Sequence, residues 1–316
     1  DSVKEVRAVS HNMMPNTLIK LGLGSAIREF ITKIGNVPNL KIECLDKGFV
    51  QLVDCMPRLA PEGQTTADYA IVQAARVSYG SGTKTVNEDR GLIRYLLRHS
   101  HTTPYEMIEF KFCCKLPIFI ARQMIRTRTA NVNEYSGRYS VIKDEYYVPK
   151  SEDIKIQSKE NKQGGSEIAP TDVADDFKKN IVSLADESYE KYLNFMDYGI
   201  SREQARMLLP VSYYTEWYWK IDLHNLLHFL ALRCDSHAQY EIRVFANAIL
   251  SLIKPIVPLA VEAWEDYHVM RGAMKFTSLE LEALKKSIQE NKFIAIDSNN
   301  KREQSEWEDK AKKLGL

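Results

Sequence analysis

Long hydrophobic runs and paired cysteines are both missing from this sequence. No stretch of about 18 uncharged apolar residues occurs, so we expect no membrane-spanning helix. The first residues, DSVKEVRAVSHNMM, lack the apolar core of a signal peptide. The five cysteines are an odd number without a CxxC pair. This argues against a disulfide framework and a zinc knuckle, and it favours a reducing, cytoplasmic compartment.

An excess of charge of either sign is also missing. The chain holds 43 Lys and Arg against 42 Asp and Glu, a net charge of +1. A protein that coats nucleic acid is strongly basic, so we expect no nucleic acid partner, although this balance still allows a local anion site. Apolar residues make up 44% of the 316 residues, enough to bury a substantial core.

Strand and helix patterns alternate along the chain from about residue 41. Phe110, Phe112, Cys114 and Leu116 fall on one face of a predicted strand, and Pro117 opens a helix, where its missing N–H costs little. The apolar spacing over 173–196 predicts one long amphipathic helix, and we interpret the polar stretch 150–170 as a loop or insertion. These patterns predict an α+β fold, a mixed domain of helices and antiparallel sheet.

Two segments flank this domain. We expect residues 1–40 to form a helical N-terminal extension, because apolar residues recur near helical spacing between 18 and 34. The main domain is expected over 41–272. Residues 273–316 are expected to form a charged helical C-terminal extension, in which Thr277 and Glu280 cap an amphipathic helix.

Positive charge is concentrated in one segment, IARQMIRTRTANVNEYSGRYS at residues 120–140. Between Arg122 and Arg138, four arginines oppose the single acid Glu134, which gives a local charge of +3. Arg122 and Arg126 lie four apart on a predicted helix, a spacing at which like charges repel unless an anion lies between them. Arginine binds two phosphate oxygens at once and stays charged. The segment therefore indicates either a phosphate site or a solvated basic helix face.

Histidine and cysteine patterns carry weaker signals. His224 and His228 lie four apart, but the residues between them lack the glutamate of a zinc protease helix, so we expect no metal site. Cys114 shares a strand face with phenylalanines and is expected to pack, whereas Cys113 lies beside lysines and could be partly thiolate. No histidine is obviously paired with either cysteine, so the sequence gives little support for covalent catalysis by a cysteine.

Two further arginines adjoin apolar residues. Arg206 lies in QARMLLP, and Arg233 lies in LRCDSHAQYEIR, directly after an apolar predicted helix. Each could take part in a structural ion pair, for Arg233 with Asp235, or could bind an anion. The residues alone leave both alternatives open.

Five motifs, taken together, resemble the flavin-dependent thymidylate synthase family. They are HTTPYEMIEFKF, LPIFIARQMIR, NEYSGRYS, QARMLLP and LRCDSHAQYEIR, in the family's order and spacing over about residues 46–270. The family signature is Arg-His-Arg, seven residues and then Ser. Arg126, Arg128 and Ser136 match it, and Thr127 stands at the position of the family's histidine.

The resemblance implies an enzyme, a methyltransferase of nucleotide biosynthesis. The family converts dUMP to dTMP by reductive methylation, with methylenetetrahydrofolate as carbon donor, FAD as cofactor and NADPH as reductant. It acts as a homotetramer whose sites are shared between subunits, and it does not depend on an enzyme cysteine attacking the pyrimidine. Two alternatives are an enzyme that modifies another pyrimidine nucleotide, motivated by Thr127, and a non-catalytic module that binds nucleic acid or a protein partner.

The resemblance also assigns roles to residues. Arg233 and His101 would be catalytic, with Arg233 facing the uracil ring and His101 lying near the flavin and the folate. The cofactor-binding set would be Thr103, Arg126, Thr127, Arg128, Thr129, Glu134, Asp222, His224 and His228. The dUMP-binding set would be Gln123, Arg126, Glu134, Ser136, Gly137, Arg138, Arg206 and Arg233.

Overall fold

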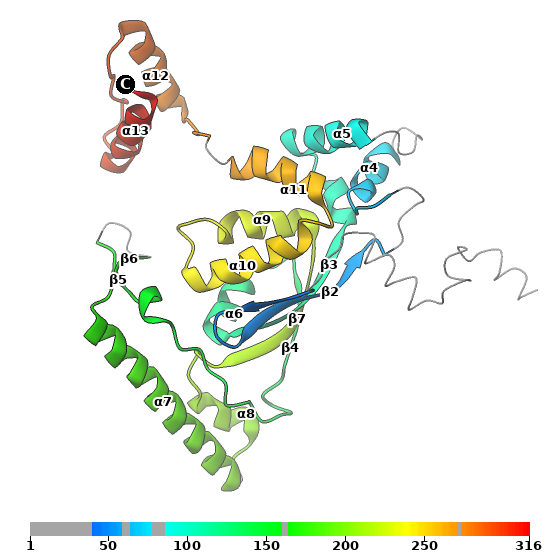
Figure 1. The fold of residues 1–316 in the computed structure, drawn as a ribbon, viewed down its shortest axis with the longest axis vertical. Coiled ribbons are helices and arrows are strands. Elements are labelled where there is room, and N and C mark those ends of the chain that lie inside the picture. The colour runs from blue at the N-terminus through cyan, green and yellow to red at the C-terminus, as the bar shows by residue number, and fades with distance from the viewer. Residues whose placement is uncertain (1–39, 59–63, 78–85, 160–163, 271–272) are drawn as a thin grey trace, which may run out of the picture. The chain divides into compact units, whose positions relative to one another are not determined.

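A computed structural model describes residues 40–58, 64–77, 86–159, 164–270 and 273–316 of the chain (Figure 1). The expected N-terminal extension, residues 1–40, lies outside the described residues except for its last position. The chain divides into two compact units, residues 1–264 and residues 265–316, and each unit is described by itself.

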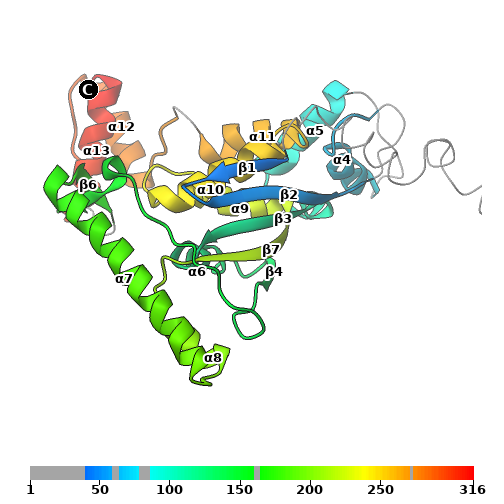
Figure 2. The ribbon, with the colours of Figure 1, turned by 60° about the horizontal axis from the view of Figure 1, so that its bottom comes forward.

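An antiparallel sheet of five strands forms the centre of the first unit (Figure 2). In spatial order the strands are β1 Lys41–Cys44, β2 Gly48–Met56, β3 Glu109–Pro117, β7 Tyr214–Asp222 and β4 Asn131–Glu134. Every neighbouring pair in this sheet is antiparallel. The predicted mixed α+β class with an antiparallel sheet is therefore confirmed.

One face of the sheet forms the core, as the alternation in β3 predicts. Phe110, Phe112, Cys114 and Leu116 are fully buried on this face. The ring of Phe112 lies 6.2 Å from that of Trp219 on β7, and Trp219 contacts a helix on the same side. Burial of these large rings is the main stabilisation of the sheet.

Helices cover this core face (Figures 1 and 2). α9 (Leu223–Arg233) packs against β7, and α10 (Tyr240–Ile253) packs against β1 and β2. The other helices of the first unit are α4 Tyr69–Arg76, α5 Val86–Arg98, α6 Ile118–Met124, α7 Thr171–Asp197, α8 Arg202–Ala205 and α11 Pro258–Trp264. Short 3₁₀ turns are η2 Thr103–Met107, η3 Ser151–Asp153 and η4 Arg206–Leu208. Among the described residues, no helix has the length and apolar character needed to cross a membrane.

A buried carboxyl joins the segment before α4 to the start of α11. Asp68 is 2% exposed, and its two oxygens accept hydrogen bonds from the N–H groups of Leu259 (3.1 Å) and Ala260 (2.9 Å). These donors belong to the first turn of α11, whose N–H groups have no partner within the helix. Burial raises the pKa of Asp68 to about 6.

The long helix α7, which the sequence predicts, holds the loop that follows β4. The hydroxyl of Tyr189 donates to the carbonyl of Ile142 (3.0 Å), and the N–H of Ile142 donates to the hydroxyl of Tyr192 (3.1 Å). Tyr213, just before β7, donates its hydroxyl proton to Asp144 (2.9 Å) in the same loop. Tyrosine hydroxyls thus fix the backbone directly after residues 136–140.

The stretch 150–170 is more ordered than the interpretation as a loop suggests. It contains η3 and a two-stranded antiparallel sheet, β5 Lys155–Gln157 and β6 Gly165–Ile168. Every residue of both strands is exposed, so neither strand has the apolar alternation that marks a half-buried strand.

The second unit is a pair of helices with its own small core. α12 (Ser278–Glu290) begins with the predicted capping box of Thr277 and Glu280. α13 (Lys301–Leu314) lies in the extension expected to be helical and charged, but the sequence did not delimit it as a second helix; Trp307 on it is fully buried. A π-helical turn, η5 Glu265–Val269, opens this unit.

Candidate active site

The segment with concentrated positive charge folds as a helix, a turn and an edge strand. α6 ends at Met124, so Arg126 lies beyond the helix, and the expectation that it shares a helix with Arg122 is wrong. The N–H of Thr127 donates to the carbonyl of Met124 (3.0 Å) as the chain turns toward β4. β4 was missed because NVNE is polar and partly exposed, which leaves no apolar alternation to detect.

Three guanidinium groups near this turn lack a counter-charge. Across the ranges that the structure describes, the side chains of Arg122, Arg126 and Arg128 make no hydrogen bond or ion pair, and all three are exposed. No carboxylate among the described residues therefore neutralises this positive charge. An anion that bound here would find free donors and would relieve the mutual repulsion.

The turn after β4 brings together four residues assigned to the nucleotide. The N–H of Arg138 donates to the hydroxyl of Ser136 (3.3 Å). A β-carbon at Gly137 would lie 2.8 Å from Cδ1 of Ile142 and 3.2 Å from Cδ of Arg206. Only glycine therefore fits there without displacing its neighbours, and Arg206 packs directly against the turn.

Glu203 on α8 contacts both arginines of this group. Its Oε2 accepts a hydrogen bond from Nε of Arg138 (2.9 Å), and its backbone carbonyl accepts one from Nε of Arg206 (3.3 Å). No sequence pattern indicates this role, because 65 residues separate Glu203 from Arg138. Only its position three residues before Arg206 on a helix could have pointed to it.

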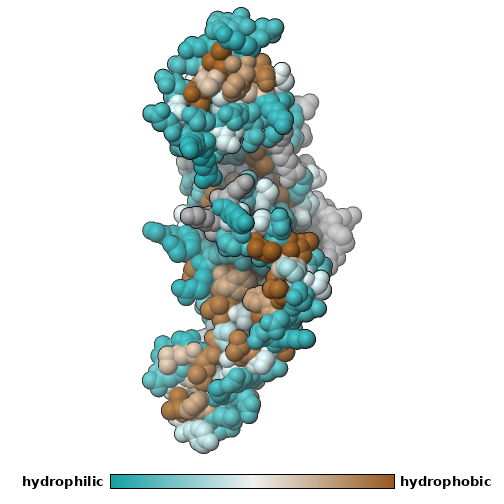
Figure 3. All heavy atoms as spheres, turned by 90° about the vertical axis from the view of Figure 1, so that its left-hand side faces the viewer, coloured by the Kyte–Doolittle hydropathy of each residue, from teal (hydrophilic) through white to brown (hydrophobic). Residues whose placement is uncertain are grey.

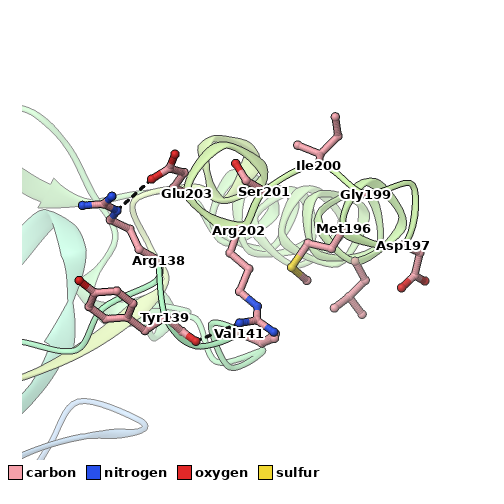
Figure 4. A pocket seen from close by; sticks show the side chains of 11 residues that line it. Arg138, Tyr139, Val141, Met196, Asp197, Gly199, Ile200, Ser201, Arg202 and Glu203 are labelled. Atoms are coloured by element: carbon pink, nitrogen blue, oxygen red, sulfur yellow. Dashed lines mark hydrogen bonds and ion pairs between the residues drawn. The ribbon is translucent and has the colours of Figure 1, made fainter.

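A pocket of about 670 Å³ adjoins this turn (Figure 4). Figure 4 shows Arg138 reaching toward Glu203, and Arg202 reaching toward the backbone carbonyl of Tyr139, which it contacts at 3.0 Å. The pocket walls come from three segments: residues 138–141, the end of α7 and the start of α8. The lining combines two guanidinium groups and two carboxylates with apolar side chains, so its formal charges balance.

The pairing of β4 with β7 places residues assigned to the cofactor at one end of the sheet. Asn131 lies opposite Lys220 in the antiparallel register. The turn 127–129, just before β4, and Asp222, at the end of β7, therefore lie at the same end. Glu134, at the other end of β4, accepts a hydrogen bond from the hydroxyl of Thr215 (2.7 Å).

The start of α9 carries the remaining cofactor-assigned side chains. Asp222 caps the helix, and its Oδ1 accepts a hydrogen bond from the N–H of Asn225 (2.9 Å). His224 is half-buried and His228 is exposed, and their spacing of four places them on one face of α9. η2 packs against α9, so Thr103 at its first position belongs to the same region.

Arg233 ends α9 with its guanidinium half-buried. It makes no hydrogen bond or ion pair to any other residue that the structure describes. Asp235, its alternative partner, instead accepts hydrogen bonds from the N–H (2.8 Å) and from Nδ1 (2.7 Å) of His237. These bonds hold the pKa of Asp235 below its usual range. Arg233 is thus available to a ligand.

Gln123 lies beside the turn that follows Arg233. Its Nε2 donates to Oε1 of Gln239 (2.6 Å), which joins α6 to the segment between α9 and α10. Arg233 makes no direct hydrogen bond to the 136–138 turn in the described part of the chain. The described contacts therefore join Ser136, Gly137, Arg138 and Arg206 into one group, and they join Gln123 to Gln239 separately.

Three cysteines, Cys55, Cys113 and Cys114, are not poised as nucleophiles. Burial and the nearby Glu216 carboxylate together raise the pKa of Cys113 to about 11. The expectation that Cys113 could be partly thiolate is therefore wrong. Burial also raises the pKa of Cys55 to about 11 and that of the fully buried Cys114 well above its usual range. The packing role expected for Cys114 is confirmed.

Comparison with known proteins identifies the family. The family model described as "Thymidylate synthase complementing protein" matches residues 62–259. A flavin-dependent thymidylate synthase of Dictyostelium discoideum is 54% identical over 286 residues, which cover 90% of this chain and 91% of the relative. The chain belongs to the flavin-dependent thymidylate synthase family. A family member from Wolbachia pipientis wMel is 47% identical over 280 residues, 88% of this chain and 95% of its own length.

A solved structure shares the fold of this family member. It is the UMP/dUMP methylase PolB from Streptomyces cacaoi bound with 5-Br UMP, with a TM-score of 0.63 and 31% sequence identity. The likeness covers 72% of this chain and 98% of PolB. The flavin-dependent thymidylate synthase fold therefore accounts for most of the chain.

Proposed function

We propose that the chain catalyses FAD-dependent reductive methylation of dUMP to dTMP, with methylenetetrahydrofolate as carbon donor and NADPH as reductant. The observation that carries this proposal is the turn 136–138 packed against Arg206, in a chain of the flavin-dependent thymidylate synthase family. We place the catalytic domain at residues 41–272, with 1–40 and 273–316 as extensions.

The dUMP phosphate is a dianion and needs donors that keep their charge. Arg126, Arg138 and Arg206 supply guanidinium groups, and Ser136 supplies a hydroxyl. Because Glu203 binds Arg138 through Nε, the two terminal nitrogens of Arg138 are left to face the phosphate. The absence of a side chain at Gly137 lets Ile142 and Arg206 pack closely against this turn, which places Arg206 beside Ser136 and Arg138.

Arg233 acts on the uracil ring. Its guanidinium stays charged at any physiological pH, and a fixed positive charge beside the ring oxygen stabilises negative charge in the transition state. Gln123 and Glu134 contribute hydrogen-bonding groups to the same nucleotide. No enzyme thiolate is required, which agrees with the raised pKa of Cys113.

The cofactor-assigned residues fit FAD chemically. Arg126 and Arg128 can neutralise its pyrophosphate, and the hydroxyls of Thr103, Thr127 and Thr129 can bind polar ring edges. Further donors and acceptors at the same end of the sheet come from Asp222, His224 and His228, and Glu134 adds a carboxylate from the other end of β4. Bound FAD supplies the hydride-transfer chemistry that no side chain offers. His101 would then hold the ring of the carbon donor beside the flavin.

We infer that the protein is a homotetramer whose sites are shared between subunits. α7 exposes a stripe of four apolar residues on one face, between 44% and 60% exposed: Val173, Phe177, Leu184 and Phe195. Figure 3 views the molecule from the side on which α7 lies, and apolar side chains gather there. A second copy of the chain that covered this stripe would remove it from water. A cytoplasmic location remains a prediction from the cysteine content.

Turnover with purified protein tests the proposed activity. We expect a yellow protein that forms dTMP from dUMP only when both methylenetetrahydrofolate and NADPH are present. A colourless protein that FAD cannot reconstitute would contradict the proposal and favour a non-catalytic binding module.

A second candidate function is methylation of UMP. PolB is described as a UMP/dUMP methylase, and the chain carries Thr127 where the family has histidine. Parallel assays with dUMP, UMP and dCMP separate the candidates through kcat/KM. Turnover with UMP and none with dUMP would replace the main proposal by this one.

A further inference from the structure

Two tyrosines of α7 bind both backbone polar groups of one residue, Ile142. The hydroxyl of Tyr189 donates to the carbonyl of Ile142 (3.0 Å), and the N–H of Ile142 donates to the hydroxyl of Tyr192 (3.1 Å). The two tyrosines are three residues apart on one face of the helix, and their ring centroids lie 5.8 Å apart. Side chains thus satisfy the N–H and C=O of a residue that belongs to no strand or helix. We call Tyr189 and Tyr192 the tyrosine pair.

The side chain of Ile142 carries this restraint to the turn 136–138. A β-carbon at Gly137 would lie 2.8 Å from Cδ1 and 3.2 Å from Cγ1 of Ile142, so the Ile142 side chain packs directly against the turn. A second hydrogen bond joins the two ends of this segment, because the hydroxyl of Tyr135 donates to the carbonyl of Val141 (2.8 Å). A displacement of Ile142 would therefore displace the turn.

Packing holds the tyrosine pair itself in place. Tyr192 is fully buried, and the ring of Tyr189 stacks on that of Tyr213, with centroids 6.1 Å apart and planes inclined by 14°. Tyr213 is also fully buried, just before β7, and its hydroxyl donates to the carbonyl of Ala185 on α7 (3.1 Å). Rings in such a close-packed interior have little room to move. The tyrosine pair therefore fixes Ile142 relative to α7 and the start of β7.

We propose that Tyr189 and Tyr192 are positioning residues for the nucleotide, because they hold Ile142 where it sets the turn 136–138 for the dUMP phosphate. This rests on the proposed function, in which that turn binds the phosphate. Neither tyrosine has to touch the ligand. Binding groups must be held within about 0.5 Å of their productive positions, so a turn that can shift binds its phosphate more weakly.

The test compares Tyr192→Phe and Tyr189→Phe with the wild type in the FAD-loaded protein. Each change removes one hydroxyl and keeps the ring. Loss of one hydrogen bond to Ile142 is expected to raise KM for dUMP about fivefold. Saturating dUMP draws the turn back into place, so kcat and KM for methylenetetrahydrofolate are expected to stay within about twofold of the wild type. A role in stability alone would lower the melting temperature and leave KM for dUMP unchanged.

Tyr146→Phe is the matched control. The hydroxyl of Tyr146 donates to Oδ1 of Asp186 on α7 (2.9 Å), so this change removes the same kind of contact between α7 and the loop, four residues beyond Ile142. KM for dUMP is expected to stay within about twofold of the wild type. An equal rise in Tyr146→Phe, or an unchanged KM for dUMP in Tyr192→Phe and Tyr189→Phe, would overturn the proposal.

Ile142→Ala tests the route from the tyrosine pair to the turn. It keeps the backbone hydrogen bonds and removes the side chain that packs against Gly137. We expect KM for dUMP to rise about fivefold to tenfold. Adding Tyr192→Phe to Ile142→Ala should then raise it by less than about twofold, because both changes act through one contact. Losses that multiply independently would show that Tyr192 acts by another route and would reject the proposal.

Calorimetric binding of dUMP to the same proteins separates this proposal from the proposed function. If the wild type binds dUMP and Tyr192→Phe binds it about fivefold more weakly, the positioning role stands even when no dTMP forms. If the wild type makes dTMP and both proteins bind dUMP equally, the proposed function stands and the positioning role is rejected. A wild type that does not bind dUMP would overturn both.

Discussion

β3 and the 126–138 segment follow each other closely in the chain. They differ in whether their charged side chains have partners within the described protein. In β3 the apolar residues are buried, and the lysines have partners, such as Lys115 with Glu145 at 2.8 Å. In the 126–138 segment Arg126 and Arg128 are exposed and unpaired within the described part of the chain. The difference teaches that this protein pairs charged groups with its own residues in the sheet, and leaves Arg126 and Arg128 without described partners in the segment that we propose binds a ligand.

The largest expected effect lies on the sheet side of this comparison. Phe112→Ala removes a fully buried ring from the core and should lower the free energy of unfolding by about 4 kcal/mol. Urea denaturation measures this loss. Tyr218→Ala, on the opposite face of the same strands and 47% exposed, should cost less than about 1 kcal/mol. Equal losses would mean that the two faces do not differ as described.

Arg233→Ala tests the ligand side. Removing a charge that acts only on the transition state should lower the rate of dTMP formation by about 100-fold to 1000-fold. The free energy of unfolding should stay nearly unchanged, because Arg233 has no partner among the described residues. Arg302→Ala, an exposed arginine of the second unit, should leave activity at the wild-type level. A methylation rate near that of the wild type in Arg233→Ala would refute the assigned role.

Asp68 extends the comparison to a buried titratable group. Its carboxylate accepts its hydrogen bonds from groups inside the protein. Its pKa of about 6 lies above the unfolded value of 3.8, so the native state holds the proton more tightly. Its stabilising contribution is complete below the unfolded pKa and is lost as the pH rises through about 6. Asp68→Asn keeps an acceptor and removes the titration.

Chemical denaturation at about pH 4.5 and at about pH 8 measures this effect. Relative to Asp68→Asn, the wild type should lose on the order of 2 kcal/mol of unfolding free energy between the lower and the higher pH. A constant difference between the two proteins would show that Asp68 has no raised pKa.

The smallest effect concerns the left-handed turn at Ser100, just after the end of α5. Ser100→Gly relieves the left-handed strain and should raise the free energy of unfolding by about 0.5–1 kcal/mol, seen as a higher melting temperature. Ser251→Gly, inside α10, should lower it by a similar amount, because glycine weakens a helix interior. Destabilisation by Ser100→Gly would show that the serine side chain itself supports the turn.

Local patterns in the sequence anticipated most elements of the fold. The alternation of β3, the period of α7 and the capping box at Thr277 each depend on residues close together in the chain. β4, β5 and β6 were not predicted, because their side chains are largely exposed and show no apolar alternation. α13 was not predicted as a separate helix, because its sequence is highly charged and Trp307 is its one fully buried ring.

The candidate site was anticipated in its residue types more than in its geometry. The positive charge of 120–140 and the family motifs predicted Arg138 and Arg206 as site residues. They did not predict that Glu203 contacts these two arginines. The ion pair considered between Arg233 and Asp235 was also undecidable from the sequence, since it depends on where His237 lies.

By itself, the sequence determined the family, the antiparallel α+β class and the location of the positive charge, because these follow from residue identity and short-range periodicity. Only the tertiary structure decided which arginines remain unpaired among the described residues, and which end of the sheet the 127–129 turn occupies. These features depend on strand register and on contacts between distant segments, which arise when the whole core packs and which no local pattern encodes.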